Sequence, residues 1–108
     1  MESNMQRAII HYLTHLAYCH VTNIHGSSYQ EKGISDLLAC YKGLHLALEL
    51  KEEADVEPAQ LAYLRKVRRA QGIAEIIYDV KTVKRIIQCI DEGRTWEPLS
   101  DLRHRKSA

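Results

Sequence analysis

One stretch of this chain narrows the possible folds more than any other. Residues 44–51 read LHLALELK, and in this run leucines alternate strictly with other side chains. A period of two places the leucines on one face of a β-strand, and it places Glu49 and Lys51 together on the other face. A face made of four leucines needs a covering layer, most simply a helix. The stretch therefore predicts a strand within a layered α/β domain.

A second apolar run comes just before this strand. Residues 36–41 read DLLACY, and Lys42-Gly43 separates the two runs. A two-residue connection of this kind predicts a β-hairpin, because glycine tolerates positive φ. Counting back from the turn places Asp36 opposite residues near Glu49. We therefore expect two carboxylates to converge at one end of the sheet.

The remaining periodic segments complete the fold. Apolar stripes at helical spacing predict helices over 4–17, 58–70 and 79–93. Two further strands are expected over 20–24 and 73–78. A helix that links strands 44–51 and 73–78 makes these two strands parallel. The sequence thus predicts an α/β fold, with a mixed central sheet of about four strands flanked by helices.

Length and composition limit the broad class of protein. The 108 residues suffice for one compact domain, which we place at 1–93, followed by a basic tail at 94–108. The cysteines (Cys19, Cys40 and Cys89) lack the spacing of a zinc site or a disulfide framework, so a reducing cytoplasm is expected. We expect neither a membrane-spanning helix nor a secretory signal, because no suitable apolar run is present.

Charge is distributed unevenly along the chain. The net charge is +1, but residues 54–108 hold eleven Lys/Arg against eight Asp/Glu. Basic residues cluster at 65–69, 84–85 and 103–106. Such clusters can meet phosphates, and they also occur on ordinary solvated helix faces. The sequence leaves both interpretations open.

Asp36, Glu49 and Lys51 are the residues that point to chemistry. Two carboxylates at one end of a sheet suit Mg²⁺ or Mn²⁺, which prefer oxygen ligands. A neighbouring ammonium can position an attacking water or stabilise negative charge on a phosphate. The same spacing also occurs by chance as an ordinary Asp at a strand start and an exposed Glu–Lys pair. On spacing alone, the ordinary interpretation is favoured.

The flanking residues add a family resemblance. Residues 32–51, KGISDLLACYKGLHLALELK, resemble the core of the VRR-NUC family, a branch of the PD-(D/E)xK nucleases. The matching positions are Gly33, Asp36, Gly43, Glu49 and Lys51. Residues 57–83 are similar to the next helix, strand and helix start of that family, and Ser35 stands where the family has proline.

The resemblance implies a restriction-endonuclease-like, three-layer fold and a phosphodiesterase that acts on DNA with Mg²⁺ or Mn²⁺. It implies that Asp36, Glu49 and the backbone carbonyl of Leu50 bind the ion, with Glu2 as a further ligand. It also gives Lys51 the role of assisting the attacking water. Gln60 would orient Lys51 or that water.

The resemblance further implies a homodimer that resolves Holliday junctions in a bacterial cell or a phage-infected host. It implies no membrane and no organic cofactor. The residues expected to contact DNA phosphates are Arg65, Lys66, Arg68, Arg69, Lys84 and Arg85. Two alternatives stay open, namely a catalytically silent DNA-binding or assembly module and a nuclease with flap or nicking specificity.

Overall fold

A computed structural model describes residues 3–24, 31–51 and 55–102. Its three helices are α1 (Asn4–Thr14), α2 (Pro58–Arg69) and α3 (Val80–Asp91). Its four strands are β1 (Cys19–Asn23), β2 (Leu37–Tyr41), β3 (Leu44–Leu50) and β4 (Ile73–Ile77). The α/β class and all seven expected elements are confirmed, with ends that differ by a few residues. No helix in these ranges is both long and apolar enough to cross a bilayer.

The strands form one mixed sheet in the order β1-β2-β3-β4. β1 pairs antiparallel with β2, β2 pairs antiparallel with β3, and β3 pairs parallel with β4. The tight turn between β2 and β3 uses positive φ at Lys42 and Gly43, as the hairpin prediction requires.

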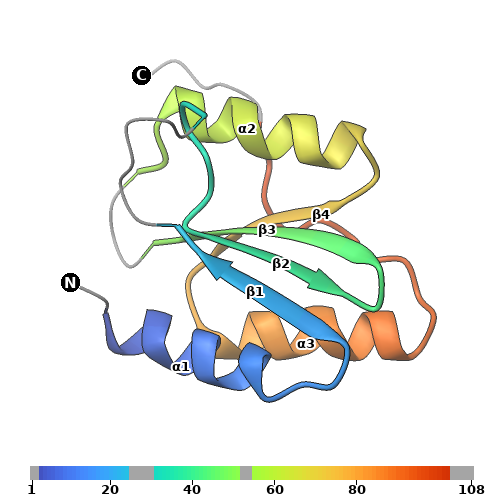
Figure 1. The fold of residues 1–108 in the computed structure, drawn as a ribbon. Coiled ribbons are helices and arrows are strands. Elements are labelled where there is room, and N and C mark those ends of the chain that lie inside the picture. Colours follow the sequence, from blue (N-terminus) through green and yellow to red (C-terminus); the bar gives the residue numbers. More distant parts are fainter. Residues whose placement is uncertain (1–2, 25–30, 52–54, 103–108) are drawn as a thin grey trace.

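Helices cover the sheet in three layers (Figure 1). α1 and α3 lie on one face, where Leu46 and Leu48 join the larger hydrophobic core. α2 lies on the other face, over β3 and β4, and packs there on Ala47. β3 is therefore buried on both faces through its middle, and this burial fixes the position of Glu49 near its end.

Local signals explain where the helices begin. Ser3 Oγ accepts a hydrogen bond from Gln6 N at the start of α1, and Asp79 Oδ1 accepts one from Thr82 N at the start of α3. Pro58 occupies the first turn of α2, where an amide hydrogen has no helical partner.

Part of the expected basic tail at 94–108 packs against the sheet. Trp96 Nε1, Leu99 N and Ser100 Oγ all donate to the carboxylate of Glu75, at 3.0, 2.7 and 2.7 Å. Glu75 lies on β4 and is fully buried, and Leu102 is only 4% exposed. We call residues 94–102 the C-terminal strap. The packed part of the chain thus extends past residue 93, while residues 103–108 lie outside the described ranges.

Candidate active site

Asp36 and Glu49 come together at one end of the sheet, as the hairpin count predicts. Leu37 is the register partner of Leu48, so Asp36 lies opposite Glu49 where β2 begins and β3 ends. Asp36 Oδ2 accepts a hydrogen bond of 2.8 Å from Leu50 N. This bond ties the Asp36 side chain to the last residue of β3.

Gly33 explains how the loop before β2 reaches this position. Gly33 has φ +80°, and a Cβ atom added there would lie 2.2 Å from the carbonyl oxygen of Ala59. Only glycine allows both this backbone conformation and this close approach. The loop therefore lies against the first turn of α2, and Asp36 follows three residues later.

Glu49 is a buried carboxylate with one unsatisfied oxygen. It is 1% exposed, and its Oε2 accepts a 2.6 Å hydrogen bond from Gln60 Nε2. Its Oε1 is buried and has no hydrogen-bond partner among the described residues. Burial, followed by the nearby negative charge of Asp36, raises the pKa of Glu49 from 4.5 to about 7. An added positive charge would relieve both effects.

Lys51 brings one positive charge to this pair. Its Nζ lies 3.7 Å from Glu49 Oε2, and its side chain is 19% exposed. Its backbone N donates to Ile77 O at 3.0 Å, which anchors Lys51 beside the end of β4. The ammonium therefore lies between a buried carboxylate and solvent, where it can contact a ligand.

Gln60 holds Glu49. Its Oε1 accepts a hydrogen bond of 3.0 Å from Glu57 N, and its Nε2 donates to Glu49. Both ends of the amide are used in this arrangement, which fixes the orientation of Glu49. The described contacts of Gln60 are with Glu49 and Glu57, whereas the resemblance implies a contact with Lys51 or water.

The carboxylate pair can accommodate a divalent cation. A cation that prefers oxygen ligands could bind Glu49 Oε1, which has no partner among the described residues. It would also offset the repulsion between the two neighbouring negative charges. Within residues 3–24, 31–51 and 55–102, no group of three or more His, Cys, Asp or Glu side chains gathers around one point. Glu2, the further ligand implied by the resemblance, lies outside those ranges. The Leu50 carbonyl, also implied as a ligand, belongs to the last residue of β3.

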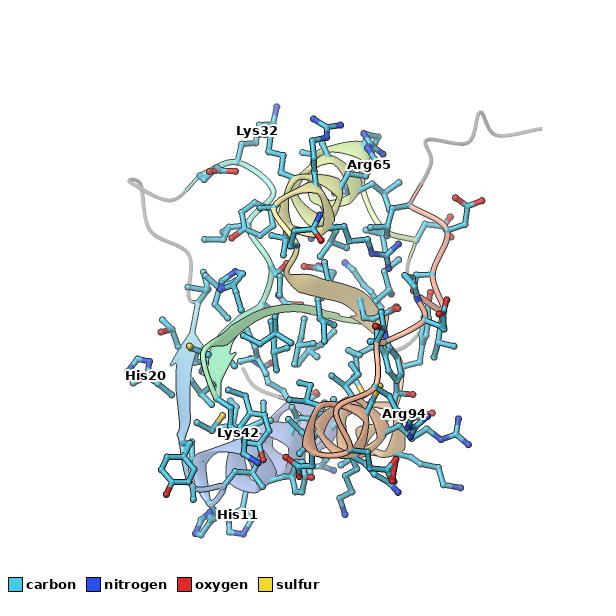
Figure 2. All side chains as sticks on the ribbon, turned by 90° about the vertical axis from the view of Figure 1, so that its right-hand side faces the viewer. His11, His20, Lys32, Lys42, Arg65 and Arg94 are labelled. Atoms are coloured by element: carbon cyan, nitrogen blue, oxygen red, sulfur yellow. The ribbon has the colours of Figure 1, made fainter. Side chains whose placement is uncertain are left out.

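The basic residues expected to contact DNA do not form one surface. Arg65, Lys66, Arg68 and Arg69 belong to α2, whereas Lys84 and Arg85 belong to α3 on the opposite face of the sheet. Figure 2 shows Arg65 on the α2 side of the sheet, far from Lys42 and His11 on the α1 and α3 side. A single DNA backbone lying on α2 would therefore not reach the pair on α3.

Two of the α2 arginines bind the C-terminal strap. Arg65 Nη1 donates to the carbonyl oxygen of Leu102. Arg68 donates to Ala74 O at 2.9 and 2.7 Å and to Ser100 O at 2.8 Å, and it lies 3.3 Å from Glu75. These contacts give Arg65 and Arg68 a structural role that the sequence pattern does not reveal.

The other basic residues are more accessible. Arg69, Lys66, Lys84 and Arg85 are exposed. Lys66 Nζ lies 3.6 Å from a carboxylate oxygen of Glu31, and Lys84 Nζ lies 5.3 Å from the ring centre of Tyr12. On the α2 side, Lys66 and Arg69 are thus the expected DNA-contacting residues that face solvent.

Two residues of interest were missed by the sequence reasoning. Glu75 is a lone carboxylate within the apolar run IAEIIY, and that break in pattern was a usable signal for a buried polar contact. Tyr78 follows β4 directly and is 59% exposed. The parallel pairing of β3 with β4 could have identified Tyr78, because it puts the residue after β4 beside Lys51.

No family model matches this sequence, and no curated protein matches it either. The resemblance to the VRR-NUC pattern therefore stays a prediction.

Proposed function

We propose that this chain is a divalent-metal-dependent DNA endonuclease. The observation that carries the proposal is the convergence of Asp36 and Glu49, because Glu49 Oε1 is buried beside a second carboxylate and has no hydrogen-bond partner among the described residues. A protein gains no stability from such an arrangement, because a buried unsatisfied charge is costly. Costly polar groups that converge at one end of a sheet are typical of functional sites.

Each residue then has a defined task. Asp36 and Glu49 would hold Mg²⁺ or Mn²⁺, and the Leu50 carbonyl and Glu2 are further candidate ligands. A bound cation supplies an activated water at neutral pH and stabilises charge on the phosphate. Lys51 stabilises negative charge on the phosphate or orients the water, and Gln60 keeps Glu49 in position.

The substrate proposal is branched DNA cleaved by a homodimer, as in Holliday junction resolution. The family resemblance supports this choice, and two sites related by a two-fold axis suit symmetric cutting. Exposed Lys66 and Arg69 on α2 would meet backbone phosphates without reading sequence. The resemblance also favours the cytoplasm of a bacterial cell or a phage-infected host as the compartment of this activity.

A cleavage assay tests the proposal. Wild-type protein and the Lys51→Ala variant are incubated with a four-way junction, a flap, a linear duplex and single-stranded DNA, each with Mn²⁺, Mg²⁺ or EDTA. We expect cuts in the junction that require the metal and disappear in the variant. A Lys81→Ala variant serves as a matched control, because it also removes one lysine charge, from an exposed position on α3 at the opposite face of the sheet.

Other results would change the proposal in defined ways. Metal-dependent cuts only in flaps or duplexes would retain the chemistry and reject the junction preference. Binding of DNA without any cleavage, under all three ionic conditions, would reject the nuclease and favour a silent DNA-binding module.

A further inference from the structure

Tyr78 is an exposed aromatic residue at the end of the sheet that carries the candidate site. It follows the last residue of β4, and 59% of its surface is exposed. Single exposed rings are common on protein surfaces, so it is the position of Tyr78 beside a polar site that makes it informative. Two other large hydrophobic residues in the described ranges are comparably exposed, Tyr18 and Leu99.

The strand register places Tyr78 next to Lys51. β3 and β4 pair in parallel, with Glu49 beside Ile76 and Leu50 beside Ile77. The hydrogen bond from Lys51 N to Ile77 O extends this ladder by one step, which makes Tyr78 the neighbour of Lys51. Adjacent strands lie about 4.8 Å apart. The backbones of Tyr78 and of the proposed catalytic Lys51 are therefore about one strand spacing apart.

The alternation of β4 indicates which face Tyr78 occupies. Ile77 belongs to the core on the α1 and α3 side, whereas Ile76 packs in the cluster under α2. Continuing this alternation puts Tyr78 on the α2 side, the same face as Glu49 and Lys51. The exposed ring and the carboxylate pair thus share one face and one end of the sheet.

We propose that Tyr78 stacks on an unpaired nucleobase next to the phosphate that Lys51 and a cation at Asp36 and Glu49 would hold. This inference rests on the proposed nuclease function and specifies the form of its substrate. A tyrosine ring offers a flat face on which any base can stack, so it adds affinity without reading sequence. The neighbouring ammonium of Lys51 would meet the adjoining phosphate, which makes the pair complementary to one nucleotide.

The surroundings favour a base over a protein partner. Tyr18 lies at the hairpin end of the sheet, where its carbonyl accepts from Lys42 N. Leu99 is held through its N at Glu75, which strand alternation places on the opposite face of β4 from Tyr78, so the three exposed side chains do not form one patch. A protein interface needs a contiguous apolar patch, whereas a single ring flanked by a cation suits a nucleotide.

A base can stack on Tyr78 only where its face is free. In a continuous duplex, neighbouring base pairs cover both faces of every internal base. At a branch point or in a single strand, at least one face is open or can be opened at low cost. Tyr78 therefore predicts a preference for branched or single-stranded DNA over an intact duplex.

The test compares Tyr78→Ala, Tyr78→Phe and the control Tyr18→Ala with wild type. Binding is measured in Ca²⁺ with a four-way junction that carries 2-aminopurine at the branch, and with a linear duplex of the same sequence. Cleavage of both substrates is then measured in Mn²⁺. We expect Tyr78→Ala to bind the junction about 10-fold more weakly and to lose the 2-aminopurine response. Tyr78→Phe and Tyr18→Ala should behave like wild type.

The outcomes separate this inference from the proposed function. Wild-type binding and 2-aminopurine response in Tyr78→Ala, with cleavage intact, would overturn the stacking role and retain the nuclease. A Tyr78-dependent 2-aminopurine response without any cleavage would retain stacking and overturn the nuclease. Equal losses on the junction and the duplex would overturn the preference for open bases. Absence of DNA binding by the wild type would overturn both proposals.

Discussion

Replacing Glu49 with glutamine should make the metal-free protein more stable at alkaline pH. Glu49 is buried beside Asp36, and its pKa is raised from 4.5 to about 7, first by burial and then by that neighbouring charge. Above pH 7 the folded protein must therefore hold two close negative charges. Glutamine has nearly the same shape, keeps an oxygen to accept from Gln60, and carries no charge.

The size of the effect follows from linkage. Each unit of pKa corresponds to about 1.4 kcal/mol, so the ionisation of Glu49 costs the folded state roughly 3 kcal/mol above pH 7. In the variant, the amide nitrogen takes the place of Glu49 Oε1, which has no partner among the described residues, and this unsatisfied donor offsets about 1 kcal/mol, which leaves about 2 kcal/mol. Between pH 4.5 and 7 the folded chain retains a proton that the unfolded chain has lost. The stability of the wild type should therefore fall as pH rises through this window.

Urea unfolding in EDTA at pH 5 and pH 8 measures this difference. We expect Glu49→Gln to exceed the wild type by about 2 kcal/mol at pH 8 and by under about 1 kcal/mol at pH 5. Adding Mn²⁺ should reverse the order, since a cation at 100 times its Kd adds about 2.7 kcal/mol to a protein that binds it. A variant less stable than wild type at pH 8 in EDTA would refute the reasoning.

Three further variants test other parts of the structure. Lys51→Ala should abolish cleavage with an unchanged circular dichroism spectrum; residual metal-dependent cutting would exclude its role. Arg68→Ala should lower the free energy of unfolding by about 3 kcal/mol, because it leaves a buried carboxylate on β4 without its ion pair, whereas the exposed Arg69→Ala should change it little. Gly33→Ala should lower both stability and activity through its clash with Ala59, and thermal melting that matches wild type would contradict this.

The fold and the position of Asp36 opposite Glu49 could be predicted from local sequence patterns. Leucine alternation in β3 and the Lys42-Gly43 turn determine the hairpin register, and the register alone brings Asp36 opposite Glu49. These signals are short-range, because each depends on residues within a few positions of one another. The parallel pairing of β3 with β4 followed from the intervening helix.

The contacts that the sequence did not predict are long-range. Glu75 accepts a hydrogen bond from Ser100, 25 residues later in the chain. Arg68 donates to the carbonyl oxygen of Ser100, which is 32 residues away. Charge clustering on α2 made Arg68 look like a phosphate contact, because no local rule shows that a strap will cover it. The hydrogen bond from Gln60 to Glu49 could likewise not be predicted, since it depends on how α2 packs against the end of β3.

The C-terminal strap also determines how this protein can associate. Ser100 Oγ accepts from Ile76 N, and Arg68 donates to Ala74 O, so two backbone groups in the middle of the outer edge of β4 already have partners and are covered by the strap. A further strand from another molecule would have to add at β1, the outermost strand on the other side (Figure 1). Two copies joined in this way would present only closed edges to a third. Edge-to-edge assembly would therefore end at a pair, and fibre growth by this route is blocked.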